Sequence, residues 1–190
     1  MQKLISIMRV IEADIPDVLI IEPKIFHDER GFFLESYQVD RYHKAGITDN
    51  FLQHNHSRSS KNVLRGLHYQ INNPQSKLLT VMRGKIFDVC VDLRKNSKYF
   101  GQSFGITLGE DMPSQLYIPA GFAHGFCVLD DFADIHYQIG AAYDPLDEAG
   151  ILWSDPSLKI QWPIASPIVC KRDSLFPLLI NTPPENLPRI

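Results

Sequence analysis

This chain consists largely of short apolar runs that end at turn residues, and that pattern limits its fold more than any other feature. Proline fixes φ and removes a backbone donor, so it interrupts helices and central strands alike. The chain has 13 prolines among 190 residues, which is above the usual share of about 5%. Helical periodicity is nearly absent. The pattern therefore predicts many short strands joined by turns, and it excludes a helical bundle.

The expected strands follow one another at short intervals. They cover residues 18–21, 32–37, 51–57, 63–70, 78–82, 85–93, 115–118, 125–129 and 134–139. One short helix is expected from about Asp40, a suitable N-cap, to Gly46, a suitable C-terminal stop. Strand alternation in 85–93 predicts a core face with Phe87 and Val89 and a solvent face with Asp88 and Asp92.

Strands at this spacing predict an all-β fold, and a double-sheet jelly roll of the cupin type is the leading candidate, with a few short helices. No repeat or linker interrupts residues 1–190, so one domain is expected. The segment after Tyr143 is rich in proline and is expected to be irregular and to pack over the sandwich rather than to extend it. Its prolines are Pro145, Pro156, Pro163, Pro167, Pro177, Pro183, Pro184 and Pro188.

The charge distribution separates classes of partner. A net charge of −3 argues against nucleic-acid binding, which needs a broad basic surface. No carboxylate lies between Asp49 and Asp88, although that block holds six Lys and Arg residues. An anion site for a phosphorylated small molecule is one interpretation, and solvated strand faces are the other. The longest stretch without charged residues, 112–129, contains two prolines and two glycines, so no membrane span is expected and the protein is predicted to be cytoplasmic.

Metal and disulfide chemistry are both disfavoured. The three cysteines, Cys90, Cys127 and Cys170, are widely spaced in apolar surroundings, which predicts buried, inert thiols. His54 and His56 have a spacing that places both imidazoles on one strand face. However, no Asp or Glu follows before Asp88 to complete a set of two histidines and one carboxylate. A metal-dependent cupin is therefore the weaker alternative.

Three strings carry residues suited to chemistry: 65–70 (RGLHYQ), 119–126 (PAGFAHGF) and 135–138 (IHYQ). Alternation predicts that His68 shares a face with Gly66 and Gln70, while Arg65 lies on the other face. No Gly-x-Ser-x-Gly elbow and no phosphate-loop or dinucleotide fingerprint occurs. What remains is acid and base chemistry on a phosphorylated ligand. A histidine base, a tyrosine acid and a lysine near an oxyanion suit proton abstraction beside a carbonyl.

The ordered motifs resemble a known family. They are residues 22–23 (EP), 28–36 (DERGFFLES), 53–59 (QHNHSRS), 63–70 (VLRGLHYQ), 101–102 (GQ), 118–126 (IPAGFAHGF), 152–153 (LW) and 160–163 (IQWP). In order and spacing they are similar to the dTDP-4-dehydrorhamnose 3,5-epimerases. The resemblance implies a dimeric, cofactor-free cupin that inverts C3 and C5 of dTDP-4-keto-6-deoxyglucose on the way to dTDP-rhamnose.

The resemblance also implies roles for particular residues. His68 resembles the family's base, Asp173 its orienting partner and Tyr137 the acid on the opposite face. Lys77 resembles the lysine beside the C4 oxygen, and Arg65 resembles a diphosphate ligand. Further substrate contacts implied by position are Arg30, Glu35, Gln53, His54, Asn55, His124, Tyr143 and Glu148.

Some positions depart from the family pattern. His54 stands where an aspartate is common, Ala142 where an aromatic residue is common, and Cys170-Lys171-Arg172-Asp173 where Ser-x-Lys-Asp is common. None of these changes removes the proposed acid or base. Epimerisation at C3 alone stays open as an alternative, because the geometry around Tyr137 would decide it. A non-catalytic sugar-binding jelly roll is the other alternative, and it would not need His68, Tyr137, Lys77 and Asp173 together.

Overall fold

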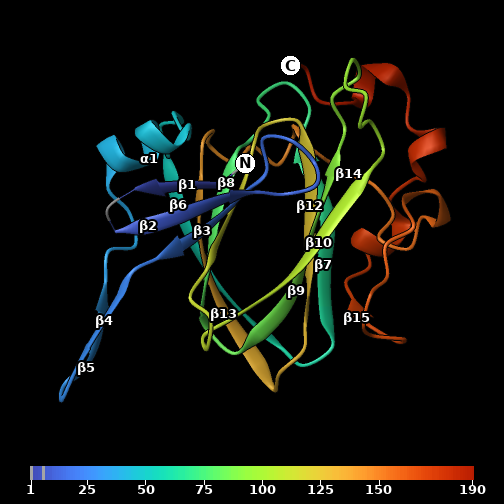
Figure 1. The fold of residues 1–190 in the computed structure, drawn as a ribbon. Coiled ribbons are helices and arrows are strands. Elements are labelled where there is room, and N and C mark those ends of the chain that lie inside the picture. The colour runs from blue at the N-terminus through green and yellow to red at the C-terminus, as the bar shows by residue number, and fades with distance from the viewer. Residues whose placement is uncertain (1, 6) are drawn as a thin grey trace.

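The computed structural model describes residues 2–5 and 7–190, and it is built around two β-sheets that face each other (Figure 1). The seven-stranded sheet has the order β1 (Gln2–Ile5), β2 (Met8–Glu12), β3 (Leu19–Pro23), β11 (Gln115–Ile118), β8 (Lys77–Arg83), β13 (Phe132–Ile139), β6 (Gln53–Ser60). The second sheet has the order β10 (Ser103–Gly109), β9 (Lys85–Asp92), β12 (Phe122–Val128), β7 (Val63–Gln70), β14 (Glu148–Gly150), and β15 (Ile168–Val169) also pairs with β7. This arrangement confirms the predicted all-β, jelly-roll class.

The main core lies between the two sheets. Leu79, Val81 and Ile135 of the seven-stranded sheet pack against Phe122 and Phe126 of the other sheet, and each is at most 5% exposed. Burial of one such side chain contributes about 1.5–3 kcal/mol. Along β8, Leu79 and Val81 face this core, while Leu78 between Lys77 and Leu79 is buried in a separate cluster on the outer face of the sheet.

Strand β9 differs from its prediction, because both of its faces are buried. Asp88 and Asp92 are 0% exposed, although alternation had placed them in solvent. Val89 and Val91 belong to a second core cluster on the outer side of the sheet, together with Leu158 and Leu187 from the C-terminal segment. The prediction was wrong because the two faces are exchanged. Asp88 lies on the inner face with Ile86 and Cys90, while the C-terminal segment covers the face that carries Val89 and Val91.

The proline-rich C-terminal segment packs over the second sheet, as predicted (Figure 1). Contrary to the prediction, it also extends that sheet, because β14 and β15 both pair with β7. Beyond the parallel pairing of β15 with β7, it is organised by short 3₁₀ turns: η1 (Pro156–Leu158), η2 (Asp173–Leu175), η3 (Leu179–Asn181) and η4 (Pro184–Asn186). Its course brings Asp173 back against β7, since an oxygen of this carboxylate accepts a hydrogen bond from the Gly66 amide at 3.0 Å.

Helix α1 (Val39–Ala45) begins slightly earlier than predicted. The N-cap is Gln38, whose side chain accepts a hydrogen bond from the Arg41 amide at 2.8 Å, rather than Asp40. Its C-terminal stop is Gly46, as predicted, with a φ of 101° in the left-handed region that glycine tolerates. The helix seats Tyr42 and Ala45 on the outer face of the seven-stranded sheet.

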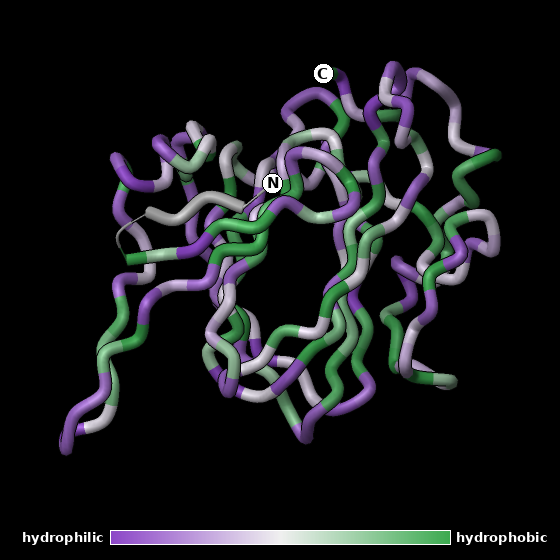
Figure 2. The backbone as a smooth tube through the Cα atoms, in the orientation of Figure 1, coloured by the Kyte–Doolittle hydropathy of each residue, from purple (hydrophilic) through white to green (hydrophobic). Residues whose placement is uncertain are grey.

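A hairpin made of β4 (Ile25–Asp28) and β5 (Gly31–Leu34) projects away from both sheets (Figure 1). Its shaft is hydrophobic and its tip is hydrophilic (Figure 2). Phe32 and Phe33 are each 69% exposed, which is unusual for residues of this size.

Two further predictions concern the cysteines and membranes. Cys90 and Cys127 are buried as predicted, but Cys170 is exposed, because the turn that follows β15 lies at the surface. Across residues 2–5 and 7–190, no helix has the length and apolar character that crossing a membrane requires.

Candidate active site

A pocket of about 310 Å³ lies between the two sheets and collects most of the predicted site residues. Nine of them line it: Gln53, Asn55, Arg65, His68, Lys77, His124, Tyr137, Tyr143 and Glu148. A tenth, Asp173, lies behind His68 with a carboxylate oxygen 2.9 Å from its Nε2. The residues come from strands of both sheets and from the C-terminal segment, so the pocket depends on the complete fold.

Arg65 and His68 both line the pocket, although simple alternation had placed them on opposite faces of β7. The reason is a break in the pairing with β12: His124 lies opposite His68, but Phe126 lies opposite Arg65. Three steps along β7 therefore match two along β12, which is a β-bulge. Gly66 has a φ of 136°, and a Cβ there would lie 2.6 Å from the Cα of Gly125. Two facing glycines thus permit the bulge that turns both side chains inward.

His68 and Asp173 form a close pair at the wall of the pocket, with His68 Nε2 2.9 Å from Asp173 Oδ1. The Asp173 side chain is 2% exposed and that of His68 is 24% exposed. Burial would raise the pKa of Asp173, but its hydrogen bond and charge interaction with His68, and the Gly66 amide, outweigh burial and hold that pKa well below its usual range. The carboxylate stays ionised and can orient the imidazole and stabilise its protonated form.

Tyr137 and Lys77 lie on the opposite sheet, on the adjacent strands β13 and β8. Burial raises the pKa of Tyr137, with Arg65 opposing the shift and Glu148 adding to it, so the phenol holds its proton at neutral pH. Lys77 is 7% exposed. Burial lowers its pKa to about 8, against the opposing influence of Glu148 and Asp88. A buried lysine that is still charged at pH 7 suits a developing oxyanion.

His124 lies one strand from His68 and is held by Asp88. Its Nε2 is 3.0 and 2.9 Å from the two carboxylate oxygens of Asp88. Burial raises the pKa of this fully buried carboxyl, while His124 and Lys77 lower it in part. Asp88 is therefore the buried partner that fixes the His124 ring in the wall of the pocket.

Polar contacts order the rim of the pocket. The Gln53 amide donates to Asn55 Oδ1 at 2.9 Å, and its oxygen accepts from the Tyr143 backbone amide at 3.0 Å. The hydroxyl of Tyr143 donates to Glu148 Oε2 at 2.9 Å. Glu148 also accepts from Arg172 Nη1 at 2.5 Å.

Three predicted site residues are not brought to this pocket. Arg30 lies on the projecting hairpin and pairs with Asp28, and Glu35 pairs with Arg41 beside α1. His54 points to the outer face of the seven-stranded sheet. There its Nε2 is 3.2 Å from Gln138 Nε2, and its ring lies edge-on to that of His136. Because Gln53 and Asn55 face inward, alternation along β6 turns His54 outward.

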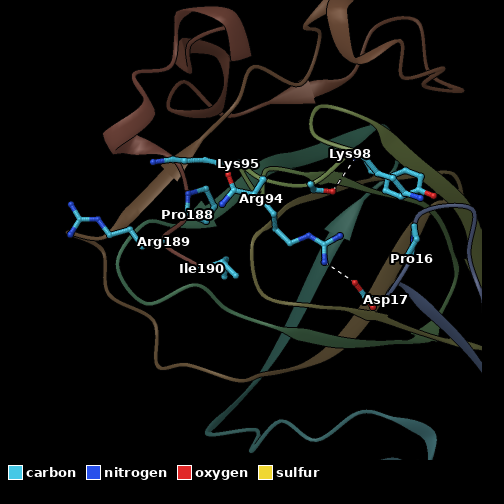
Figure 3. Close-up of a pocket in the computed structure, with 11 residues that line it drawn as sticks. Pro16, Asp17, Arg94, Lys95, Lys98, Pro188, Arg189 and Ile190 are labelled. Carbon is cyan, nitrogen blue, oxygen red and sulfur yellow. Dashed lines mark hydrogen bonds and ion pairs between the residues drawn. The ribbon is translucent and has the colours of Figure 1, made fainter.

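A larger cavity of about 650 Å³ lies away from this chemistry, at the 94–99 loop and the C-terminal residues (Figure 3). Its central cation, Arg94, is already neutralised by Asp92, which it meets at 3.0 and 2.8 Å, and by Asp17 at 2.7 Å. The smaller pocket, which contains the buried Lys77 and the His68 ring paired with Asp173, is therefore the candidate active site.

Sequence reasoning missed two residues that shape this site. Asp88 was placed in solvent, and no local sequence signal marked its contact with His124. Arg172 was noted only as a departure from a family pattern, yet it lines the pocket and contacts both Glu148 and Asp173. Within the described residues, no three His, Cys, Asp or Glu side chains are grouped as a metal ion would require.

Comparisons with known proteins agree on one family. The family model of the dTDP-4-dehydrorhamnose 3,5-epimerases matches residues 12–181. A dTDP-4-dehydrorhamnose 3,5-epimerase of Shigella flexneri is 50% identical over 168 residues, which cover 87% of this chain and 93% of that protein. A dTDP-4-dehydrorhamnose 3-epimerase of Streptomyces niveus is 39% identical over 87% of this chain and 81% of its own length.

A solved structure is also very similar. The crystal structure of a dTDP-6-deoxy-D-glucose-3,5-epimerase from Legionella pneumophila, in complex with dTDP-4-keto-L-rhamnose, superimposes with a TM-score of 0.93. It is 47% identical in sequence, and the match covers 96% of this chain and 98% of that one.

Proposed function

This chain belongs to the dTDP-4-dehydrorhamnose 3,5-epimerase family, and from that premise we infer that its pocket carries out proton transfer at C3 and C5 of a dTDP-4-keto-6-deoxy sugar. The activity is an isomerase activity of dTDP-rhamnose biosynthesis. The observation that carries the inference is the position of His68 and Tyr137 on opposite sheets, both lining one pocket. A sugar ring bound between the sheets meets a base on one face and an acid on the other.

Inversion of a carbon requires two such groups. The carbon loses a proton from one face of the ring and gains one on the other, so a single residue cannot readily serve both faces. Neutral His68 takes the proton, and Asp173 stabilises the imidazolium that forms. Tyr137 then donates its phenolic proton to the carbanion from the other side. The C4 ketone acidifies both neighbouring carbons, so one base can serve C3 and C5.

Lys77 stabilises the intermediate between these two steps. Removal of the proton places negative charge on the C4 oxygen, where a buried ammonium is most effective because the surroundings screen it poorly. Arg65 lines the same pocket and provides a fixed positive charge for the diphosphate. No step needs a redox cofactor or a metal, so we propose that the enzyme is cofactor-free.

A homodimer completes the proposal. Arg30 and Glu35 match substrate contacts of the family but lie outside the pocket of their own chain, and the hairpin that carries Arg30 exposes Phe32 and Phe33. A second copy could cover those rings and supply Arg30 to the neighbouring site. The mass in solution tests this, and a monomer that is fully active would contradict it. The cytoplasmic location stays a prediction of the sequence.

The reaction itself is tested with dTDP-4-keto-6-deoxyglucose in deuterated water. Mass spectrometry and NMR then report deuterium at each carbon and the configuration of the product. Deuterium at C3 and C5 with inversion at both is expected. Inversion at C3 alone would assign the chain to the alternative activity, and no exchange at either carbon would contradict an epimerase.

A further inference from the structure

The Nε2 nitrogen of His68 lies beside one hydrogen-bond acceptor and one hydrogen-bond donor, and it cannot bond to both at once. Nε2 lies 2.9 Å from Asp173 Oδ1 and 3.1 Å from Arg172 Nη2. A carboxylate only accepts hydrogen bonds and a guanidinium only donates them. Nε2 of a neutral imidazole carries either a proton or a lone pair. It therefore satisfies one partner at a time, and the choice fixes which nitrogen of the ring is the base.

The two competitors are held very differently. Asp173 is fixed in place, since its side chain is 2% exposed and its second oxygen accepts from the Gly66 amide at 3.0 Å. The Arg172 side chain is 51% exposed. It reaches His68 by way of two other hydrogen bonds, from Nη1 to Glu148 Oε2 at 2.5 Å and from Nε to Asp173 Oδ1 at 3.1 Å. Arg172 is the member of the network that can leave.

We propose that Arg172 is a positioning residue that sets the tautomer of His68 by competing with Asp173 for Nε2. While Arg172 is seated on Glu148, it donates to a bare Nε2 and the ring proton is on Nδ1. When Arg172 withdraws, Nε2 carries the proton and donates it to Asp173. Nδ1 then presents the lone pair that accepts a proton from the sugar. The inference rests on the proposed function only in naming Nδ1 as the catalytic nitrogen.

The experiment measures the tautomer directly in the full-length, ligand-free protein labelled with ¹⁵N-histidine. Protonated and bare ring nitrogens have well separated ¹⁵N shifts, and the His68 signals are assigned by their loss in His68→Gln. The spectra are recorded where the imidazole is neutral. Arg172→Met is compared with wild type, with Lys171→Met as the matched control, because Lys171 is an exposed neighbouring cation with no side-chain partner among the described residues.

Two variants should move the tautomer in opposite directions. Arg172→Met removes the donor and is expected to shift the ratio about tenfold or more toward the Nε2–H form, the effect of one hydrogen bond to a charged group. Asp173→Asn replaces the carboxylate by a weaker acceptor and is expected to shift it toward Nδ1–H. Lys171→Met should match wild type. An unchanged ratio in Arg172→Met, or shifts of the same sign in both variants, would overturn the proposal.

A second variant covers the case in which Arg172→Met does not fold. Glu148→Gln keeps the arginine but weakens its anchor, so an intermediate shift toward Nε2–H is expected, and no shift would count against the proposal. This readout is independent of turnover. A tautomer that responds as expected in a protein that does not exchange protons at C3 or C5 would refute the proposed function and leave this inference standing.

Discussion

Replacement of Lys77 by methionine should make the protein more stable and much less active. Methionine has a similar length and no charge, so it can fill the same buried space. Burial lowers the pKa of Lys77 from an ordinary 10.5 to about 8. One pKa unit corresponds to about 1.4 kcal/mol, so keeping Lys77 charged at pH 7 costs the folded protein about 3 kcal/mol. Lys77→Met should raise the free energy of unfolding by up to that amount.

The gain should depend on pH in a defined way. Below pH 8, Lys77 is protonated in both the folded and the unfolded chain, so the full cost applies. Between pH 8 and 10.5 the folded chain releases the proton while the unfolded chain retains it. Stability rises with pH wherever the unfolded state binds more protons. The free energy of unfolding of the wild type therefore rises toward that of Lys77→Met in this interval, and the two values become equal above pH 10.5.

Urea denaturation at pH 7 and at several values up to pH 10.5 measures the difference, with Lys98→Met as a surface control expected to lie within about 0.5 kcal/mol of wild type. In parallel, kcat of Lys77→Met should fall about 10²–10³-fold, as for the loss of one oxyanion donor. If Lys77→Met is no more stable than wild type at pH 7, or if its gain in unfolding free energy does not change with pH, then Lys77 is not a buried ammonium that costs the folded protein stability.

The other predictions concern the base, the bulge and the absence of a metal. His68→Ala should lower turnover by about 10²–10⁴ with little change in the melting curve; if stability falls instead of rate, His68 is a structural residue. Gly66→Ala should destabilise the protein by at least about 1–3 kcal/mol and impair substrate binding, because a Cβ at a φ of 136° would meet Gly125. The urea midpoint measures the loss of stability and KM measures the loss of binding. Wild-type values of both would contradict the role of the bulge. Exhaustive chelation should leave activity intact, and activity that is lost with bound metal and restored by its addition would revive the metal-cupin alternative.

Much of the sheet architecture could be predicted from the sequence, because turn residues mark the ends of its strands. The strands 63–70 and 115–118 were predicted with the bounds that the structure shows. Strand β10 was missed, since Gly105 and Gly109 interrupt its apolar pattern. The burial of Asp88 could not be predicted from β9 alone, because it depends on which face of β9 meets the other sheet and on the contact with His124 of the neighbouring strand β12.

Most residues of the candidate site could be singled out from the sequence, but their geometry could not. Resemblance to the family identified His68, Tyr137, Lys77 and Asp173, which the fold brings to one pocket or directly behind it. Alternation failed at Arg65, because a bulge in one strand depends on which residues of its neighbour it meets. The position of Arg172 beside His68 depends on how the C-terminal segment turns after β15, and no local pattern encodes that turn.

The most direct test of the account is the fate of substrate protons in Tyr137→Phe, which removes one hydroxyl and keeps the ring. With dTDP-4-keto-6-deoxyglucose in deuterated water, His68 should still exchange the protons next to the ketone, but without an acid on the opposite face they should return to the original side. The account predicts deuterium in the substrate with little epimer. Undiminished inversion at C3 and C5 would contradict it, because the opposite face would then be protonated by another group.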